Sequence, residues 1–463
     1  MDGFRGYHSE WNLGSPGGWD YQRVTQIIGK AVWSRLNEII PIGVDLDFDH
    51  PLLYPIDGFT EMLLEAHRSR EGSNTGLIAV VAEEETLLDV TENINLAEKL
   101  SSVPGITGAL MAPHELEFTG GKVSWRGNPV SIIFMDFNTD ILLSLHRKKG
   151  LSPLLKAVGE GRVINPRGTE PINVKSTYEI ITGAHKDRFH PETVRRTPWT
   201  RQFYPRKTEG PGGETIEDLI EWTRMNWESL VLKPERGYSG IGVRVGGVNE
   251  NADEAIELAL KEKNYIVQEK IPFCLWAEDN PDLDRESRRV VMTRYQTDFR
   301  CLFGPGRMFG FLVRYGGIPT NVGSGGGVQP LGILRSNVSV REAVTRINEA
   351  ILKMNYGDLF EVAQMQEKMA LKERFTYLLG PIKIALRPRV LAPVHIDALT
   401  SYCKTVWSDC LTLEKMWLSG ELDPIISIEE EELEIARSQP WGGSYAVFAS
   451  DGLFSFGAHT EET

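Results

Sequence analysis

The first strong pattern in the chain is a run of apolar residues at helical spacing between residues 19 and 39. Apolar positions three and four apart fall on one face, as in an amphipathic helix. These positions are Val24, Ile27, Ile28, Ala31, Val32, Leu36 and Ile39. Pro41 ends the predicted helix. Residues 44–49 then alternate strictly between apolar and acidic, which predicts a strand with Asp45 and Asp47 on one face.

Short apolar runs alternate with helical patterns between residues 77 and 165. The runs are 77–81, 108–111 and 130–135. Runs of this length that are apolar on both faces are typical of buried parallel strands, so the segment predicts a parallel α/β layer. Asp136 and Asn138 follow the third run. They are either ligand contacts, which α/β sheets place at this end of a strand, or part of an ordinary helix cap.

The pattern changes after Asn165-Pro166. Residues 188–213 are rich in Arg, Pro, Thr and Gly and predict a long connection. Residues 214–335 alternate strand runs with glycine loops, and residues 339–420 are helical in pattern. Near the end, two apolar runs at 445–448 and 453–456 flank Asp451-Gly452. An Asp-Gly pair between two such runs is a turn signal, so the sequence predicts a β-hairpin there.

Composition and charge exclude some classes of protein for this chain. The chain has 463 residues with 50 basic and 64 acidic side chains, a net charge of −14. This charge argues against nucleic acid or an anionic membrane as the main partner, because both require a basic surface. The four cysteines form no CxxC pair, the start is polar, and no apolar stretch approaches the roughly 18 residues of a membrane span. We therefore expect a cytoplasmic protein.

The segment 230–243 carries the strongest candidate chemistry. An apolar strand delivers Lys233, a loop with Gly237, Tyr238, Ser239 and Gly240 follows, and a second strand begins at Ile241. The glycines allow backbone N–H groups to approach phosphate oxygens, and the lysine supplies a point charge. The alternative is a hairpin with a surface lysine. The segment is neither a P-loop nor a dinucleotide fingerprint, since a strand rather than a helix follows the glycines.

A second segment, 265–272, is a strand that ends in polar residues before Pro272. Its last residues are Gln268, Glu269, Lys270 and Ile271. Such an edge offers backbone groups to an adenine ring and a carboxylate to ribose hydroxyls. The same pattern also fits any amphipathic strand.

The third segment, 297–327, places an arginine on each of two predicted strands. These are Arg300 and Arg314, and the loop that follows contains Asn321, Ser324 and a run of glycines. Arginine recognises phosphate or carboxylate in a planar, multidentate manner, and the loop offers N–H donors to a developing oxyanion. A flexible linker is the alternative, although a linker rarely lies in the middle of a folded region.

In this order, the three segments resemble the ATP-grasp superfamily over residues 163–335. Residues 77–180, with Asn165-Pro166 and Lys175, more loosely resemble the permuted branch that includes eukaryotic glutathione synthetase and glutathionylspermidine synthetase-like ligases. The resemblance implies an α/β (α+β) protein with an ATP-grasp fold. Its implied regions are an N-terminal helix and acidic strand (1–76), a Rossmann-like substrate domain (77–170), a nucleotide-binding region (171–335), and a helical region with a C-terminal hairpin (336–463).

The resemblance also implies roles for individual residues. Lys175 and Lys233 would bind the phosphates of ATP, residues 237–240 would form a flap, and residues 268–271 would hold adenine and ribose. Arg300, Arg314, Asn321 and Ser324 would meet the transferred phosphoryl group or the substrate carboxylate.

Magnesium is the implied metal, and here the sequence departs from the family pattern. The family commonly uses a Glu-x-Asn on a late strand plus another acid, and no Glu-x-Asn occurs after residue 335. The substitutes that we consider are Asp45, Asp47, Glu235, Asp298 and Glu461. Asp45 and Asp47 are otherwise simply a solvated strand face.

These observations lead to an ATP-dependent carboxylate–amine ligase as the expected function. Family members activate a carboxylate as an acyl phosphate, which an amine then attacks. The expected partners are a small-molecule carboxylate and an amine, and a homodimer fits the resemblance. Two alternatives stay open: a small-molecule kinase that uses the same phosphate site, and a nucleotide-binding protein without catalysis, which the missing Glu-x-Asn suggests.

Overall fold

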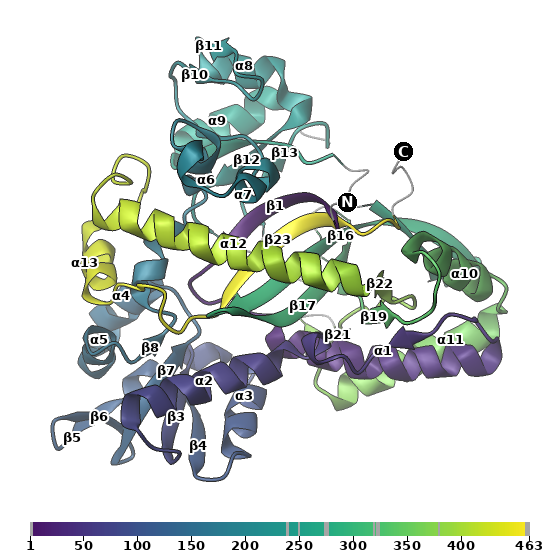
Figure 1. Ribbon diagram of the computed structural model, residues 1–463, viewed down its shortest axis with the longest axis horizontal. Helices are drawn as coiled ribbons and strands as arrows, with labels where there is room; N and C mark the ends of the chain where they lie inside the picture. Colours follow the sequence, from purple (N-terminus) through teal and green to yellow (C-terminus); the bar gives the residue numbers. More distant parts are fainter. Residues whose placement is uncertain are drawn as a thin grey trace.

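The centre of the molecule is an antiparallel sheet that joins the first and last strands of the chain (Figure 1). The computed structural model describes residues 3–237, 240–248, 251–272, 277–317, 320, 325–377 and 380–458. The strand order in the sheet is β1-β23-β16-β17-β18, and β15 also pairs with β16. The strands are β1 (Arg5–Asn12), β15 (Ala277–Asp284), β16 (Arg289–Gly304), β17 (Arg307–Gly316), β18 (Gly327–Val328) and β23 (Phe448–Ser455).

The prediction of a C-terminal hairpin with its turn at Asp451-Gly452 is wrong. Residues 448–455 form one continuous strand, β23, which pairs with β1 on one side and β16 on the other. Gly452 has no left-handed φ, and a Cβ there would lie 2.1 Å from the ring of Phe454, so the glycine serves close packing and not a turn. Asp451 therefore lies in the middle of the sheet and not at an exposed tip.

The two faces of this sheet have different roles. Phe299, Phe454 and their neighbours on one face pack against α12 (Pro393–Leu418), which crosses the sheet diagonally (Figure 1). On α12 the packing residues Leu399, Tyr402 and Val406 recur at helical spacing. Because side chains alternate along a strand, the residues between the buried aromatics face the opposite side. Asp298, Arg300 and Asp451 are on that side.

A second sheet forms the α/β layer that the apolar runs predict. Its parallel strands are β3 (Gly76–Val81), β4 (Ile106–Met111), β7 (Asn128–Met135) and β8 (Val163–Ile164), and β5 (Glu117–Thr119) and β6 (Lys122–Trp125) extend it. Ile78 and Val80 pack on one side with α2 (Pro55–Glu71) and α3 (Thr91–Ser101). Ala79 and Val81 pack on the other with α4 (Thr139–Lys149) and α5 (Ser152–Gly159). This layer is buried on both faces, as its sequence indicates.

A third, four-stranded sheet has the order β13-β12-β14-β9 and packs on two short helices. Its elements are β9 (Thr200–Gln202), β12 (Leu230–Pro234), β13 (Arg244–Val245), β14 (Tyr265–Glu269), α8 (Leu219–Met225) and α9 (Ala252–Glu262). The predicted connection at 188–213 thus contains regular structure: α7 (Pro191–Arg196) and the strand β9. The helix α6 (Thr177–Thr182) precedes the connection.

The helix predicted over residues 19–39 is confirmed as α1 (Trp19–Ile39), which packs beside α11. The predicted strand at 44–49 is shorter: only β2 (Leu46–Asp47) pairs, in a small sheet with β19 (Leu331–Leu334) and β22 (Arg389–Leu391). The remaining elements are α10 (Val340–Leu352), α11 (Tyr356–Lys372), α13 (Glu430–Ser438), and the pairs β10 (Thr208–Glu209) with β11 (Thr215–Ile216) and β20 (Thr376–Tyr377) with β21 (Gly380–Pro381). No helix in the described ranges is long and apolar enough to span a membrane.

Candidate functional site

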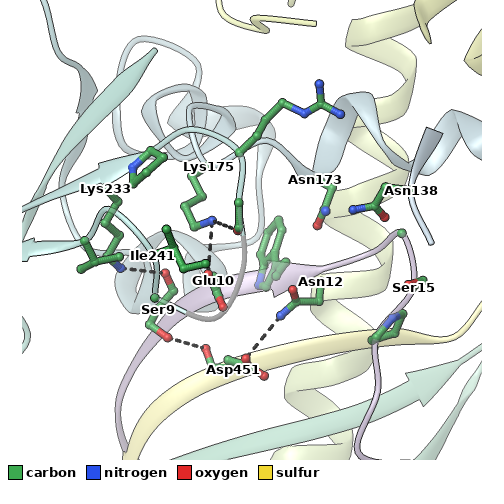
Figure 2. A pocket seen from close by; sticks show the side chains of 18 of the residues that line it. Ser9, Glu10, Asn12, Ser15, Asn138, Asn173, Lys175, Lys233, Ile241 and Asp451 are labelled. Carbon is green, nitrogen blue, oxygen red and sulfur yellow. Dashed lines mark hydrogen bonds and ion pairs between the residues drawn. The ribbon is translucent and has the colours of Figure 1, made fainter. Parts of the chain in front are cut away.

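A cleft of about 820 Å³ lies where the three large sheets meet. One wall comes from β1, β16, β17 and β23 of the central sheet, a second from the loops after β7 and β8, and a third from β12 and the segment that follows it. In Figure 2, Lys175, Lys233 and Ile241 occupy one end of the cleft, and Ser15, Asn138 and Asn173 occupy the other. Eight of the sequence-predicted site residues lie in this cleft together: Lys175, Lys233, Glu235, Gly237, Gly240, Asp298, Arg300 and Arg314.

Charged side chains form a row across the central sheet. Glu10 on β1 pairs with Asp451 on β23, which in turn pairs with Arg300 on β16. The guanidinium group of Arg300 donates to both oxygens of Asp451, at 2.6 Å each, and to the carbonyl of Gly17 at 2.8 Å. A bidentate pair of this kind fixes the direction of the arginine as well as its charge.

A second row lies one step along the same strands. Asp298 and Arg314 are directly opposite on β16 and β17, with Nε of Arg314 2.8 Å from the Asp298 carboxylate. Arg314 also donates to Asp451 at 3.2 Å. Burial alone would raise the pKa of Asp451, but the two guanidinium groups outweigh it and hold that pKa below its usual value. The four side chains thus form one ionised cluster on the floor of the cleft.

A β-bulge at Ser9 decides which residues of β1 face the cleft. His8 pairs with Gly452 and Glu10 with Asp451, so Ser9 is an extra residue in the ladder. The ring of Trp11 consequently lies on the same side as that of His8, 5.0 Å away, although three positions separate them. An unbroken strand would place Glu10 with His8 against the α12 core and turn Trp11 into the cleft. With the bulge, Glu10 and Asn12 line the cleft, and the buried Trp11 packs beside His8 while still contributing to the cleft wall.

The two predicted phosphate-binding lysines converge from different segments. Nζ of Lys175 donates to the carbonyl of Gly237 at 3.0 Å and lies 3.4 Å from the Glu10 carboxylate. Nζ of Lys233 donates to Gln268 at 2.7 Å and to the carbonyl of Ser9 at 3.4 Å. Both lysines line the cleft. The cleft therefore has a strongly cationic end.

The loop after Lys233 has a backbone that depends on glycine. Gly237, Gly240 and Gly242 have φ values of 122°, 71° and 76°, which residues with a side chain rarely adopt. Gly237 and Gly240 line the cleft, and Ile241, 74% exposed, lies at its mouth. Tyr238 and Ser239, the other predicted flap residues, lie outside the described residues.

Lys233 should make anion binding depend on pH. Burial, opposed by Glu10 and aided by Lys175, lowers the pKa of the Lys233 ammonium from 10.5 to about 8. A phosphate ligand prefers the protonated lysine, so the Kd for a polyphosphate ligand is expected to rise as the pH increases through about 8. Calorimetric Kd values between pH 6.5 and 9.5 would measure this rise. The variant Lys233→Arg, which stays charged, should show a flat profile; the same break in both proteins would contradict the assignment to Lys233.

The other end of the cleft is polar and acidic. Asn138 begins α4, but its side chain makes no cap hydrogen bond, and the N–H of Thr139 is instead satisfied by Glu170 at 3.0 Å. Asp136 accepts from Asn93 at 2.6 Å, and burial raises its pKa to about 6. Asp136 and Asn138 both line the cleft. The ordinary-cap interpretation of Asn138 is thus not supported by a cap hydrogen bond, and the ligand-contact interpretation stays a prediction.

Several other predicted site residues lie elsewhere. Gln268 is buried behind Lys233, and Lys270 donates to Gly246. Among the described residues of the cleft wall, the four residues predicted to hold adenine and ribose do not occur. They are Gln268, Glu269, Lys270 and Ile271. Asn321, Ser324 and Glu461 lie outside the described residues.

The proposed metal carboxylates are not brought together. Asp45 and Asp47 lie beside β19, away from the cleft wall, and Asp47 binds Arg335 at 2.7 Å. Glu235 lines the cleft but accepts a hydrogen bond from Gln202, and burial raises its pKa. Asp298 is held by Arg314. Across the described ranges, no group of three or more His, Cys, Asp or Glu side chains is arranged to hold a metal ion.

The sequence analysis missed three residues of the cleft: Glu10, Asn12 and Asp451. Glu10-Trp11-Asn12 is itself a Glu-x-Asn. It was missed because it stands before the other segments, whereas the family pattern places this motif after them. In space it lies beside Asp451, with Nδ2 of Asn12 3.3 Å from that carboxylate. The Glu-x-Asn spacing was visible in the sequence, but the sequence did not show that Asp451 lies beside it on the sheet.

Comparisons with known proteins give distant similarities only. No family model matches the chain, and no curated protein matches it. Among solved structures it is similar to a RimK domain protein ATP-grasp from Sphaerobacter thermophilus, with 15% identity over 46% of this chain and 70% of that one and a TM-score of 0.26. It is also similar to the macrocyclase MdnC from Microcystis aeruginosa, solved with its precursor peptide MdnA, with 11% identity over 63% and 83% and a TM-score of 0.30.

A third similar structure is D-alanyl-alanine synthetase A from Vibrio cholerae, with 11% identity over 50% of this chain and 68% of that one and a TM-score of 0.26. Identities and TM-scores at this level do not establish a family for the chain.

Proposed function

We propose that the protein is an ATP-dependent carboxylate–amine ligase that works through an acyl phosphate. The observation that carries this proposal is the meeting of Lys175 and Lys233 in one cleft, beside the cluster of Arg300, Arg314, Asp298 and Asp451. A polyanion at the lysine end would have its reacting group directed along the floor toward the arginines.

Two features of the cleft support ATP as the ligand: its cationic side chains and its apolar side chains. Lys175 and Lys233 would bind phosphate oxygens, and the backbone N–H groups near Gly237 and Gly240 would add donors. Apolar side chains line the same end and offer a surface to the purine ring. They are Ile241, Val243, Val245 and Val248.

The cleft also fits a magnesium ion carried with the nucleotide. Magnesium in such sites takes one or two carboxylates from the protein and completes its shell with phosphates and water. Glu10 and Asp451, with the amide oxygen of Asn12, supply oxygen ligands next to the lysines. A bound magnesium ion would offset negative charge on the phosphates. This set replaces Asp45, Asp47, Glu235 and Asp298 as our proposed metal ligands.

The rest of the chemistry belongs to the floor and far end of the cleft. Arg300 and Arg314 would stabilise the charge that develops as a substrate carboxylate attacks the terminal phosphate. Their bonds to Asp451 and Asp298 orient them in the cleft before substrate binds. Asp136, with a pKa of about 6, is ionised at neutral pH and would attract an incoming ammonium group.

Nucleotide turnover tests the proposal. We expect ADP release that requires both a carboxylate and an amine, measured in a coupled assay across a panel of small acids and amines. The product should be a condensed species, which mass spectrometry separates from the phospho-adduct of a kinase. The double variant Arg300→Lys/Arg314→Lys should release at least about 100-fold less ADP, because lysine does not reproduce the bidentate geometry. Absence of amine- and carboxylate-dependent ADP release across the whole panel would refute the proposal.

A further inference from the structure

One peptide group in the cleft wall is held at both ends by charged side chains. The carbonyl oxygen of Gly17 accepts from Nη1 of Arg300 at 2.8 Å, and the N–H of Gly18 donates to the Glu92 carboxylate at 2.9 Å. Both groups belong to the peptide bond between Gly17 and Gly18. In this trans peptide the C=O and N–H bonds point in opposite directions, so its dipole lies between a guanidinium group and a carboxylate.

Glu92 reaches this peptide from a different layer of the molecule. It is in the first turn of α3, is 4% exposed, and is not among the described residues that line the cleft. Its carboxylate also accepts from the N–H groups of Asp20 and Tyr21, at 2.7 and 3.0 Å. Glu92 thus supplies the cap that α1 lacks, because Gly18, which has no side chain, is at the N-cap position.

Glycine on both sides makes the orientation of this peptide easy to change. Gly17 and Gly18 have no Cβ, and Gly18 has a φ of 102°, so a half-turn of the peptide meets less steric resistance than between residues with side chains. After such a rotation the carbonyl oxygen would face the Glu92 carboxylate, and the N–H would face Arg300. Both contacts would be repulsive, so the charge of Glu92 opposes the rotation.

From these contacts we infer that Glu92 is a positioning residue for Arg300, because it fixes the Gly17–Gly18 peptide with its carbonyl toward the guanidinium group. Asp451 accepts from Nε and Nη2 of the same arginine, so Nη1 is directed by the loop and the other nitrogens by the sheet. The effect on catalysis rests on the proposed function, whereas the effect on Arg300 itself does not.

Glu92→Gln tests the inference, and Glu414→Gln is its matched control. Glutamine has nearly the same shape but is neutral, and it replaces one acceptor oxygen with a donor group. Glu414 is also buried, at 2% exposed, and accepts from the N–H of Gly442 at 2.8 and 3.0 Å. It lies on α12 and is not among the described residues of the cleft wall. Thermal unfolding should show that both variants are folded at the assay temperature.

The first measurement is hydrogen exchange of the Arg300 guanidinium group, by NMR of the full chain labelled with ¹⁵N-arginine. Burial raises the pKa of Glu92 to about 7, so spectra are recorded at pH 8, where its carboxylate is mostly ionised. The spectrum of Arg300→Lys assigns the signals. Exchange should be at least about fivefold faster in Glu92→Gln than in the wild type and unchanged in Glu414→Gln. Glu92→Asp, which is too short to keep the same bonds, should also exchange faster and serves if Glu92→Gln does not fold.

The second measurement is kcat for ADP release. Glu92→Gln should lower kcat about tenfold and change the KM for ATP by less than about twofold, because a misdirected Arg300 is felt in the transition state. In the Arg300→Lys background the same substitution should change kcat by less than about twofold, since the two residues act through one contact.

Two results overturn the inference and leave the ligase proposal standing. One is an exchange rate of Arg300 that is the same in Glu92→Gln as in the wild type, or that rises equally in Glu414→Gln. The other is an equal fractional loss of kcat from Glu92→Gln in the wild-type and Arg300→Lys backgrounds, which would mean a general effect on the fold. Absence of ADP release from the wild type would refute the proposed function, and the exchange rates would still decide whether Glu92 positions Arg300.

Discussion

Replacing Lys233 with methionine is expected to lower kcat/KM for ATP by about 100- to 1000-fold, the loss typical of removing one preorganised charge donor from an active site. Lys233 is one of the two lysines at the end of the cleft where we propose that the nucleotide binds, and its bonds to Gln268 and the Ser9 carbonyl hold it in place. Methionine has a similar length without the charge. Initial rates of ADP release at varied ATP concentration measure the effect.

The unfolding temperature of Lys233→Met and the activity of a control variant show whether the loss of kcat/KM is caused by unfolding. Burial lowers the pKa of Lys233, so its charged form is disfavoured in the folded state, and Lys233→Met should unfold at the same temperature as the wild type or higher. Lys270→Met removes a lysine that donates to Gly246 outside the cleft wall and should change kcat/KM by less than about twofold. Equal losses in the two variants would contradict the placement of the nucleotide at Lys233.

Replacing Asp451 with asparagine is expected to damage both stability and activity. Asp451 accepts three hydrogen bonds from Arg300 and Arg314 and is 2% exposed. Removal of its charge leaves two guanidinium groups without their shared partner, which should lower the free energy of unfolding by about 3 kcal/mol. Urea unfolding at pH 7 measures the stability, and ADP release should fall by at least about 100-fold as the arginines lose their orientation.

The control for Asp451 is an exposed ion pair. Asp49 pairs with Lys30 at 2.6 Å, with side-chain exposures of 67% and 49%, so Asp49→Asn should change the free energy of unfolding by less than about 1 kcal/mol. The contribution of Asp451 also has a defined pH range. Its native pKa lies below 3.8, so the stabilisation is present above that pH and is lost as the pH falls through the lower native value. If Asp451→Asn were as stable as Asp49→Asn, the ionised cluster would not support the sheet.

Local patterns predicted the elements that depend on local sequence. The helix over residues 19–39 and the parallel layer of residues 77–165 follow from apolar spacing, and the structure contains both. Arg300 and Arg314 each lie on a strand, as predicted, and the structure adds that these two strands pair. In each case the residues that determine the element are within a few positions of one another.

The sequence failed where distant segments determine the structure. Asp451-Gly452 has the composition of a turn, but β1 and β16 supply hydrogen-bonding partners on both sides and hold the pair extended. Glu10 and Asn12 were missed because their strand contains a bulge, which breaks the alternation from which a strand is normally recognised. The sequence predicted an open strand edge at residues 268–271. In the structure β9 pairs with residues 266–268, and the N–H groups of Glu269 and Lys270 donate to the carbonyls of Trp199 and Ser229.

The pairing of β1 with β23 has a consequence for synthesis on the ribosome. Asn12 and Asp451 are 439 positions apart, so at about 5–20 residues per second the earlier strand waits roughly 20 to 90 s for its neighbour. During this interval nascent chains carry an unpaired strand edge and an incomplete cleft, and the hydrogen-bonding groups of that edge have no partner strand within the chain. Chaperone occupancy of nascent chains should therefore persist until the last strand emerges.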